Sequence, residues 1–315
     1  MRIKLWGVRG SIPSPLTQAD YSRRLKQILD RAISARVSAD GVDDFLSGLT
    51  PDLRYVYGGN TTCIEVQPAP GVHLIVDAGT GIVGLGDELM KGPFGKGEGQ
   101  LHLFFTHTHW DHIQGLPFFK PLYVPGNKIT FLSTEPDLEE RLTMQMQPLF
   151  FPMPFHQTGS SKSFVTVGSD PYLCEGLTIT TCGLRHPGGS TAYRFLDKQK
   201  SFIFATDAEF TGTDIEARSP YDDFFAAADV LLLDAQYTLD DHFNKFDWGH
   251  TSQTMAVNCA ANWKVKNLIL THHEPSYPDE RLYQNYLAAL EHRQNLGVHD
   301  LNIYLGREGM QITLE

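Results

Sequence analysis

Short runs of β-branched and aromatic residues recur along the whole chain and predict most of its regular structure. Glycine, proline or aspartate bounds each run, as is typical of strands in globular proteins. The predicted strands are 2–6, 61–67, 72–77, 101–106, 128–133, 177–182, 191–195, 201–206, 229–234, 267–271 and 301–305. Helical periodicity is rarer, and it predicts helices near 18–36, 137–147, 251–263 and 279–295.

The order of these elements narrows the fold class. The strands come in runs, with helices interspersed between them and not in strict alternation with them. This order disfavours a doubly wound parallel sheet and favours an α/β protein with two mostly antiparallel or mixed sheets and helices outside. No change in composition divides the chain, so we expect a single domain over residues 1–315, with insertions near 16–56 and 134–170.

The composition is that of an ordinary globular protein. Hydrophobic residues make up 41% of the chain and charged residues 20%. No apolar run approaches the ~20 residues that a membrane-spanning helix needs, and the first residues lack the apolar core of a signal peptide. The four cysteines show no CxxC spacing and are typical of reduced thiols. We therefore expect a cytoplasmic protein without a membrane partner.

The formal net charge of −11 affects which partners are expected. Proteins that track long nucleic acids usually carry a basic stripe, because binding gains from the release of counterions. The densest basic stretch here is one short helix, with Arg23, Arg24, Lys26 and Arg31. A long nucleic acid is therefore disfavoured, whereas a small phosphate ester held by metal ions stays compatible with the charge.

The stretch THTHWDH, residues 106–112, places four possible metal ligands directly after a predicted strand. His107 and His109 are two residues apart and therefore point the same way in an extended segment. Asp111 and His112 follow where the chain turns into a helix, which aims them at a second point. Nitrogen and oxygen ligands without a thiolate suit Zn²⁺, Mn²⁺ or iron.

Further possible ligands stand at the ends of three later predicted strands: His186 after LTITTCGLR, Asp207 after FIFAT, and His272 after LILT. Each of these residues alone is more often structural than ligating. Together with the first cluster they make seven ligands, which is enough for two divalent ions that share one carboxylate.

These motifs together resemble the metallo-β-lactamase fold hydrolases. The resemblance is carried by HTHWDH, the later histidine, ATDAE, the histidine after LILT, and GGNTTCIEV followed by LIVDAGTG, and it extends over about residues 2–310. It implies an αββα sandwich with a dinuclear site at its edge, holding two divalent ions that we expect to be Zn²⁺, with Mn²⁺ as the alternative.

The resemblance also assigns roles to individual residues. By this comparison, the first ion is held by His107, His109 and His186, and the second ion by Asp111, His112 and His272. Asp207 is then the bridging ligand. Asp77 matches the carboxylate that orients a ligand histidine in this family, and such partners fix the tautomer and the ring geometry.

A second group of motifs points to one branch of the family. WGHTSQTMA (248–256), LLLDAQYT (231–238) and HPGGSTAYRF (186–195) resemble segments of the tRNase Z and cyclic phosphodiesterase branch. The resemblance makes Asp111, His250 and Asp234 the catalytic residues, with His250 as a general acid that Asp234 orients. A structural alternative is that Thr251 or Ser252 caps the following helix and that the histidine is incidental.

Other residues are weaker candidates for contact with substrate. His273 adjoins a predicted ligand, His156 lies in an aromatic segment, and Arg9 lies in the turn after the first strand. His273 and His156 have packing alternatives, and for Arg9 a structural salt bridge is an equally good interpretation. The apolar segment 148–155 has two interpretations, a wall that stacks a nucleobase and a contact in a homodimer. The GxGxxG pattern at 79–84 is explained by the family's turn and predicts no dinucleotide cofactor.

The sequence therefore predicts a dinuclear metal hydrolase, in which a hydroxide between the ions attacks a small phosphodiester such as a cyclic nucleotide or a cyclic phosphate. We find no basic, glycine-rich arm of the kind that grips tRNA, which disfavours a tRNA 3′-processing endonuclease. A thioester or lactone hydrolase remains an alternative, because such enzymes share the seven ligands. A metal-binding sensor without activity is the non-enzymatic alternative.

Overall fold

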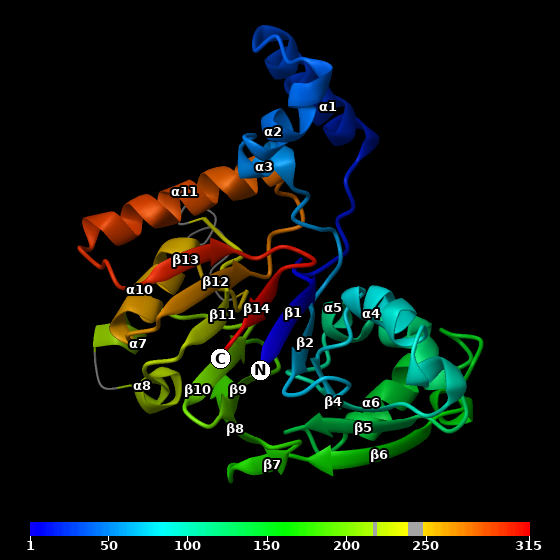
Figure 1. Cartoon of the computed structure of the whole chain (residues 1–315). Helices are drawn as coiled ribbons and strands as arrows, with labels where there is room; N and C mark the ends of the chain where they lie inside the picture. The colour runs from blue at the N-terminus through cyan, green and yellow to red at the C-terminus, as the bar shows by residue number, and fades with distance from the viewer. Residues whose placement is uncertain (217–218, 239–247) are drawn as a thin grey trace.

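Two seven-stranded mixed sheets pack face to face, and helices cover their outer faces (Figure 1). This computed structural model describes the chain except for residues 217–218 and 239–247. The first sheet has the order β14 (Gln311–Thr313), β1 (Arg2–Gly7), β2 (Cys63–Gln67), β3 (His73–Val76), β4 (Gln100–Phe104), β5 (Lys128–Ser133) and β6 (Ser161–Thr166). The second has the order β13 (Asn302–Leu305), β12 (Asn267–Thr271), β11 (Val230–Asp234), β10 (Lys200–Ala205), β9 (Ser190–Asp197), β8 (Leu177–Leu184) and β7 (Tyr172–Cys174).

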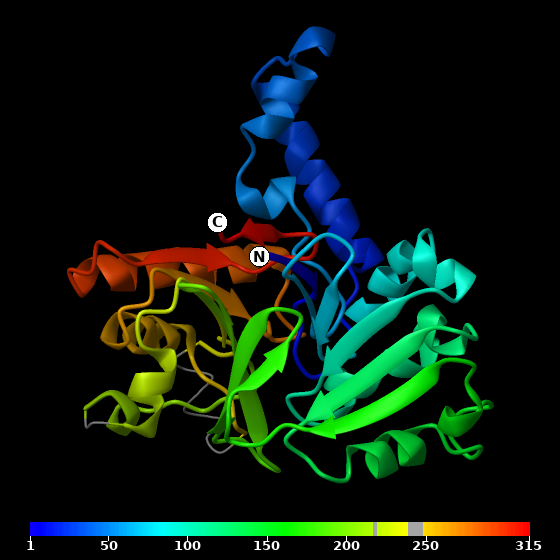
Figure 2. The same ribbon diagram turned by 60° about the horizontal axis from the view of Figure 1, so that its bottom comes forward.

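Each sheet is antiparallel on one side and parallel on the other. Strands β3 to β6 run parallel in the first sheet, and strands β10 to β13 run parallel in the second. Because the carboxyl ends of parallel strands lie at one edge of a sheet, loops that leave them can bring side chains together there. Strand β14 returns to pair with β1, so the two termini lie side by side (Figure 2).

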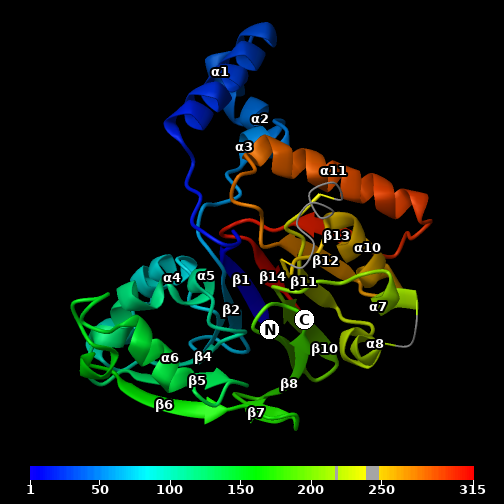
Figure 3. The same cartoon turned by 180° about the vertical axis from the view of Figure 1, so that it is seen from behind.

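The helices cover the outer faces of this sandwich. Helices α4 (Gly81–Leu89) and α6 (Leu138–Gln145) lie over the first sheet, and α7 (Thr213–Glu216), α8 (Pro220–Phe225), α10 (Gln253–Asn262) and α11 (Asp279–Asn295) lie over the second (Figures 1 and 3). Between the sheets, alternating residues such as Val66, Phe104 and Phe204 form a buried core. The αββα sandwich predicted from the sequence is therefore confirmed.

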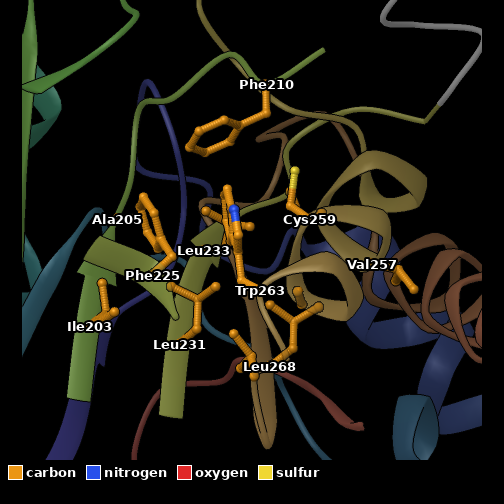
Figure 4. Packing of buried hydrophobic residues seen from close by; sticks show 14 of the residues in the cluster. Ile203, Ala205, Phe210, Phe225, Leu231, Leu233, Val257, Cys259, Trp263 and Leu268 are labelled. Atoms are coloured by element: carbon orange, nitrogen blue, oxygen red, sulfur yellow. The ribbon is translucent and has the colours of Figure 1, made fainter. Parts of the chain in front are cut away.

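An aromatic cluster fixes α10 against the second sheet (Figure 4). Phe225 stacks on Trp263 with ring centroids 4.2 Å apart, and Phe210 meets Trp263 edge-on at 5.2 Å. Each fully buried aromatic side chain contributes on the order of 1.5–3 kcal/mol to stability. This packing anchors the segment just before α10, which carries His250.

The two expected insertions differ in structure. Residues 16–56 contain α1 (Gln18–Ser34), η1 (Ala39–Gly41), α2 (Val42–Ser47) and α3 (Pro51–Arg54), which project from the sandwich at one end (Figure 1). Residues 134–170 contain α6, η5 (Phe155–Gln157) and also β6, which pairs with β5 as the edge of the first sheet. Part of this second range therefore belongs to the sandwich.

The remaining short helices are α5 (Trp110–Ile113), η2 (Pro93–Lys96), η3 (Leu116–Phe118) and η4 (Lys120–Tyr123). Of these, α5 directly follows His109 and carries Asp111 and His112 of the predicted site. Within the described residues, no helix combines the length and the apolar character that crossing a membrane requires.

Candidate metal centre

The predicted site residues follow the ends of parallel strands in both sheets. Asp77 follows β3, His107 follows β4, Asp207 follows β10 and His272 follows β12. Asp77, Asp207 and His272 adopt positive φ angles of 62°, 55° and 58°. Residues other than glycine rarely adopt this left-handed conformation, and such strained positions cluster at functional sites.

Three imidazoles form a first group. His107, His109 and His186 each offer a ring nitrogen, and these nitrogens all lie within 4.8 Å of one another. Nε2 of His186 is 3.1 Å from Nδ1 of His109. The sequence predicted that His107 and His109 face the same way, and the structure places them so.

Two carboxylates and two imidazoles form a second group, made of Asp111, His112, Asp207 and His272. All four residues are buried. Nε2 of His112 lies 3.2 Å from Oδ2 of Asp111 and 3.0 Å from Oδ2 of Asp207. Nε2 of His272 lies 3.2 Å and 3.3 Å from the same two oxygens.

Asp207 of the second group also faces the first group. Its Oδ2 faces His112 and His272, as above, whereas its Oδ1 lies 3.9 Å from Nε2 of His107 and 3.7 Å from Nε2 of His186. Each oxygen of one carboxylate therefore faces a different set of imidazoles. This is the geometry that a bridging ligand needs.

Hydrogen bonds fix the tautomer of four histidines. Nδ1 of His112 donates to Asp77 at 2.8 Å, and Nδ1 of His186 donates to the Gly249 carbonyl at 2.9 Å. Nδ1 of His272 donates to Oε1 of Gln236 at 3.2 Å. Nδ1 of His107 donates to the Thr106 hydroxyl at 3.0 Å. The Thr106 hydroxyl in turn donates to Asp77. In each ring Nδ1 faces its partner and Nε2 faces Asp207. With a cation bound there, the proton of each ring would sit on Nδ1 and the lone pair of Nε2 would face the cation.

Burial and neighbouring charges set the proton affinities of the cluster. Burial and the nearby His112 ring hold the pKa of His107 well below its ordinary value. For Asp207, burial favours the neutral acid, but the imidazoles of His112, His272 and His107 outweigh it and hold the pKa well below its ordinary value. For His272, burial is outweighed by Asp207 and Asp111, which raise the pKa to about 9.

The donor set fits divalent cations. The buried Nε2 atoms of His107 and His112 have no hydrogen-bond partner among the described residues, although leaving a buried nitrogen unpaired is costly. Nitrogen and carboxylate donors without a thiolate suit zinc or another borderline divalent metal. The free cysteines lie outside both groups.

His250 lies beside the second group and is held by a carboxylate. Its Nδ1 is 2.7 Å from Oδ2 of Asp234, and its ring stacks on that of His272 at 5.0 Å. Ser252, not His250, caps α10, because its hydroxyl accepts the Met255 N–H. Helix capping therefore accounts for Ser252 and leaves the His250–Asp234 pair unexplained by local structure.

A cavity of about 490 Å³ opens onto the cluster. It is lined by Ser11, His109, Trp110, Asp111, His186, Pro187, Asp207, Trp248 and His250. Sequence reasoning identified the titratable residues of this lining and missed its two tryptophans. It also missed Gln236 and Gly249, which orient ligand histidines, and Ser11, whose N–H donates to Asp111 at 2.8 Å. The signal for Gly249 and Trp248 was their place in WGHTS, next to His250.

Three predicted substrate contacts lie away from this cavity. His273 is buried, and its Nε2 donates to the Gly306 carbonyl at 2.8 Å. Arg9 is buried as well, donating to the carbonyls of Gly58, Glu274 and Tyr277 and pairing with Asp279. His156 is exposed on η5, outside the cavity lining. The first two side chains are therefore occupied in packing and the third is exposed outside the cavity lining, and contact of these residues with substrate stays a prediction.

Comparison with known proteins agrees with this geometry. Residues 73–273 match the family model described as the beta-lactamase superfamily domain. A curated relative, "Ribonuclease Z" of Picosynechococcus sp. (strain ATCC 27264 / PCC 7002 / PR-6), is 30% identical over 118 residues, which is 37% of this chain. That match covers 35% of the relative, so the chain spans about a third of the length of that protein.

Solved structures share the fold over nearly the whole chain. The metallo-β-lactamase fold protein YhfI from Bacillus subtilis has a TM-score of 0.64 at 16% identity, covering 99% of this chain and 98% of that one. A diphosphatase from the PhnP family has a TM-score of 0.58 at 17% identity, covering 100% of this chain and 98% of that one. At these identities the likeness establishes the fold alone.

Proposed function

Because this chain belongs to the β-lactamase superfamily, a family of metal-dependent hydrolases, we propose that it is a dinuclear phosphodiesterase for a small substrate. The observation that carries the proposal is the hydrogen bond of 2.7 Å between His250 and Asp234, next to two groups of possible metal ligands. The cluster by itself fits several hydrolytic reactions. The tethered histidine adds a proton donor, which a reaction with a poor leaving group needs.

The ligand assignment follows the two groups of side chains. His107, His109 and His186 would hold one ion, and Asp111, His112 and His272 would hold the other. Asp207, whose two carboxylate oxygens face the two sets of imidazoles, would be shared between the ions. Zn²⁺ suits this donor set best, and Mn²⁺ is the alternative. When bound, such a pair of ions activates water and neutralises the phosphoryl oxygens.

The chain's own residues perform the proton transfers. His250 lines the cavity, and its Nδ1 is held by Asp234, so its Nε2 is free to protonate the departing alkoxide. General acid catalysis of this kind typically contributes 10²–10⁴-fold to the rate. Asp111 also lines the cavity, where its carboxylate can take the proton that the attacking water loses.

Size and charge favour a small ester over tRNA. The cavity of about 490 Å³ suits a compact ligand, and the net charge of −11 opposes a long polyanion. The match to proteins named Ribonuclease Z makes tRNA 3′ processing the second candidate. A cyclic nucleotide or a cyclic phosphate remains the substrate class that we propose.

The test compares phosphodiester and acyl substrates on one protein. We expect the full chain, loaded with Zn²⁺ or Mn²⁺, to hydrolyse bis-p-nitrophenyl phosphate and not a model thioester or lactone. His250→Ala should keep its metal ions and lose on the order of 10²-fold or more in turnover. His299→Ala, at an exposed histidine, is the matched control and should behave like the unchanged protein. Faster turnover of the thioester, unaffected by His250→Ala, overturns the proposal.

A further inference from the structure

Two of the four tryptophans of the chain line the metal cavity, and both are largely exposed to solvent. The exposed fraction is 66% for Trp110 and 63% for Trp248. By contrast, Trp263 is buried in the core beneath α10. A large aromatic ring left in water forgoes the stabilisation that burial gives, and single exposed rings are common. Here two such rings line the same cavity as the histidines and aspartates of the centre.

Local structure turns Trp110 outward while its neighbours turn inward. Helix α5 begins at Trp110, and Asp111, His112 and Ile113 of the same helix are buried. Trp110 lies between two side chains of the centre, His109 and Asp111, both of which line the cavity. A group that rests on this indole is therefore within reach of a phosphate bound at the cluster.

Trp248 approaches the cavity from the segment that carries the proton donor. It precedes Gly249, whose carbonyl accepts the His186 N–H at 2.9 Å, and stands two residues before His250. A glycine is required at 249, because its φ is +82° and a Cβ there would lie 2.3 Å from Nδ1 of His186. The backbone next to Trp248 is thereby held against a histidine of the centre.

We propose that Trp110 and Trp248 form a stacking subsite for a planar heteroaromatic base, so that the substrate is a nucleotide ester and not a sugar phosphate without a base. This inference rests on the proposed function. Aromatic side chains bind bases through their π faces without needing positive charge, which suits a protein of net charge −11. Indole combines a large apolar face with a polar N–H, which suits a contact at a wet surface.

The subsite lies apart from the aromatic segment 148–155, which the sequence offered as a base-stacking wall. Phe150 and Phe151 do not line the metal cavity, and Phe155 is buried in the core of the first sheet. Apart from the histidines of the centre, the described aromatic residues that line the cavity are the two tryptophans. They are therefore the residues that can contact a base attached to the phosphate.

Binding of two phosphate esters that differ only in the base tests the subsite. Calorimetric titration of the metal-loaded full chain would compare adenosine 5′-monophosphate with ribose 5-phosphate. We expect the nucleotide to bind about tenfold more tightly or better, since one stacked base contributes a factor of this order. Trp110→Ala and Trp248→Ala should each reduce that preference several-fold and leave the affinity for ribose 5-phosphate unchanged. Trp110→Phe should retain most of it.

Phe118→Ala provides the matched control, because Phe118 is 60% exposed and lies outside the cavity lining. Equal affinities for the two esters in the unchanged protein overturn the inference, as does a preference that survives in Trp110→Ala and Trp248→Ala. Hydrolysis of bis-p-nitrophenyl phosphate, measured on the same samples, separates the two claims. Turnover without a base preference overturns the subsite alone, whereas the absence of any phosphodiester turnover overturns the proposed function.

Discussion

The imidazole of His250 is tied to the end of a buried strand by the carboxylate of Asp234, at 2.7 Å. Asp234 is the last residue of β11 and is fully buried, and it also accepts the N–H of Gln236 at 3.0 Å. The strand therefore fixes the carboxylate, and the carboxylate fixes the ring. His250 lies on a loop, and this hydrogen bond positions its ring relative to the rigid sheet.

The pair should behave as one catalytic unit. Asp234→Asn removes the charge that holds the ring, so we expect turnover of a phosphodiester to fall on the order of 10²-fold, with metal content unchanged. The double variant Asp234→Asn/His250→Ala should be no slower than His250→Ala alone, because the carboxylate acts only through the ring. Steady-state kinetics of the three variants measure this. Multiplicative losses in the double variant would show that Asp234 acts on something other than His250.

Asp77 should control metal affinity without touching the ions. It accepts from Nδ1 of His112 at 2.8 Å and from the backbone N–H and hydroxyl of Thr106. We expect Asp77→Asn to weaken the binding of one ion by about 10–100-fold, because the His112 ring loses the carboxylate that orients it. Competition with a chromogenic chelator measures the affinity. Asp87→Asn, at a surface carboxylate paired with Lys120, is the control and should leave the affinity as it is.

His273 should make the protein less stable in mild acid. Burial and the nearby Arg9 guanidinium lower the pKa of His273 to about 3, from about 6.5 in an unfolded chain. The folded state therefore holds a neutral ring, and this contribution to stability is complete above pH 6.5 and is lost as the pH falls from 6.5 toward 3.

The variant His273→Gln measures this contribution, because glutamine can also donate to the Gly306 carbonyl and does not titrate. Between pH 7.5 and 5.5, the unfolding free energy of the unchanged protein should fall by about 1 kcal/mol more than that of the variant. Urea titrations of chelator-treated samples give the two free energies and keep metal release out of the comparison. Parallel pH profiles would mean that His273 can be protonated inside the fold.

The features that the sequence predicted well are those with strong local patterns. His107 and His109 follow an apolar strand at a spacing of two, so the alternation of side chains along an extended segment is enough to predict their common direction. The long helices that became α1 and α11 likewise carry clear start signals. Strands β6, β7 and β14 were missed, because β6 alternates between exposed and half-buried positions at a sheet edge and the other two have three residues each.

Other features depend on contacts that no local pattern encodes. Helix α4 was not predicted, because its glycines disfavour a helix. Packing requires the first of them, since a Cβ on Gly81 would lie 2.6 Å from the Trp6 backbone. His272 and His273 are adjacent, and only the fold decides which of the two rings faces the centre. The φ of 58° at His272 helps to turn the two rings apart. Trp110 was not identified as a site residue, because its neighbours His109 and Asp111 are the titratable residues of this segment.

The stoichiometry of bound metal tests the account most directly. We expect elemental analysis of the metal-loaded full chain to give two ions per subunit, and Asp207→Asn to hold at most one, because both groups of imidazoles face that carboxylate. Asp44→Asn, at an exposed carboxylate on α2, should still hold two. Fewer than two ions in the unchanged protein, or two ions retained in Asp207→Asn, would contradict a bridged pair of cations at this centre.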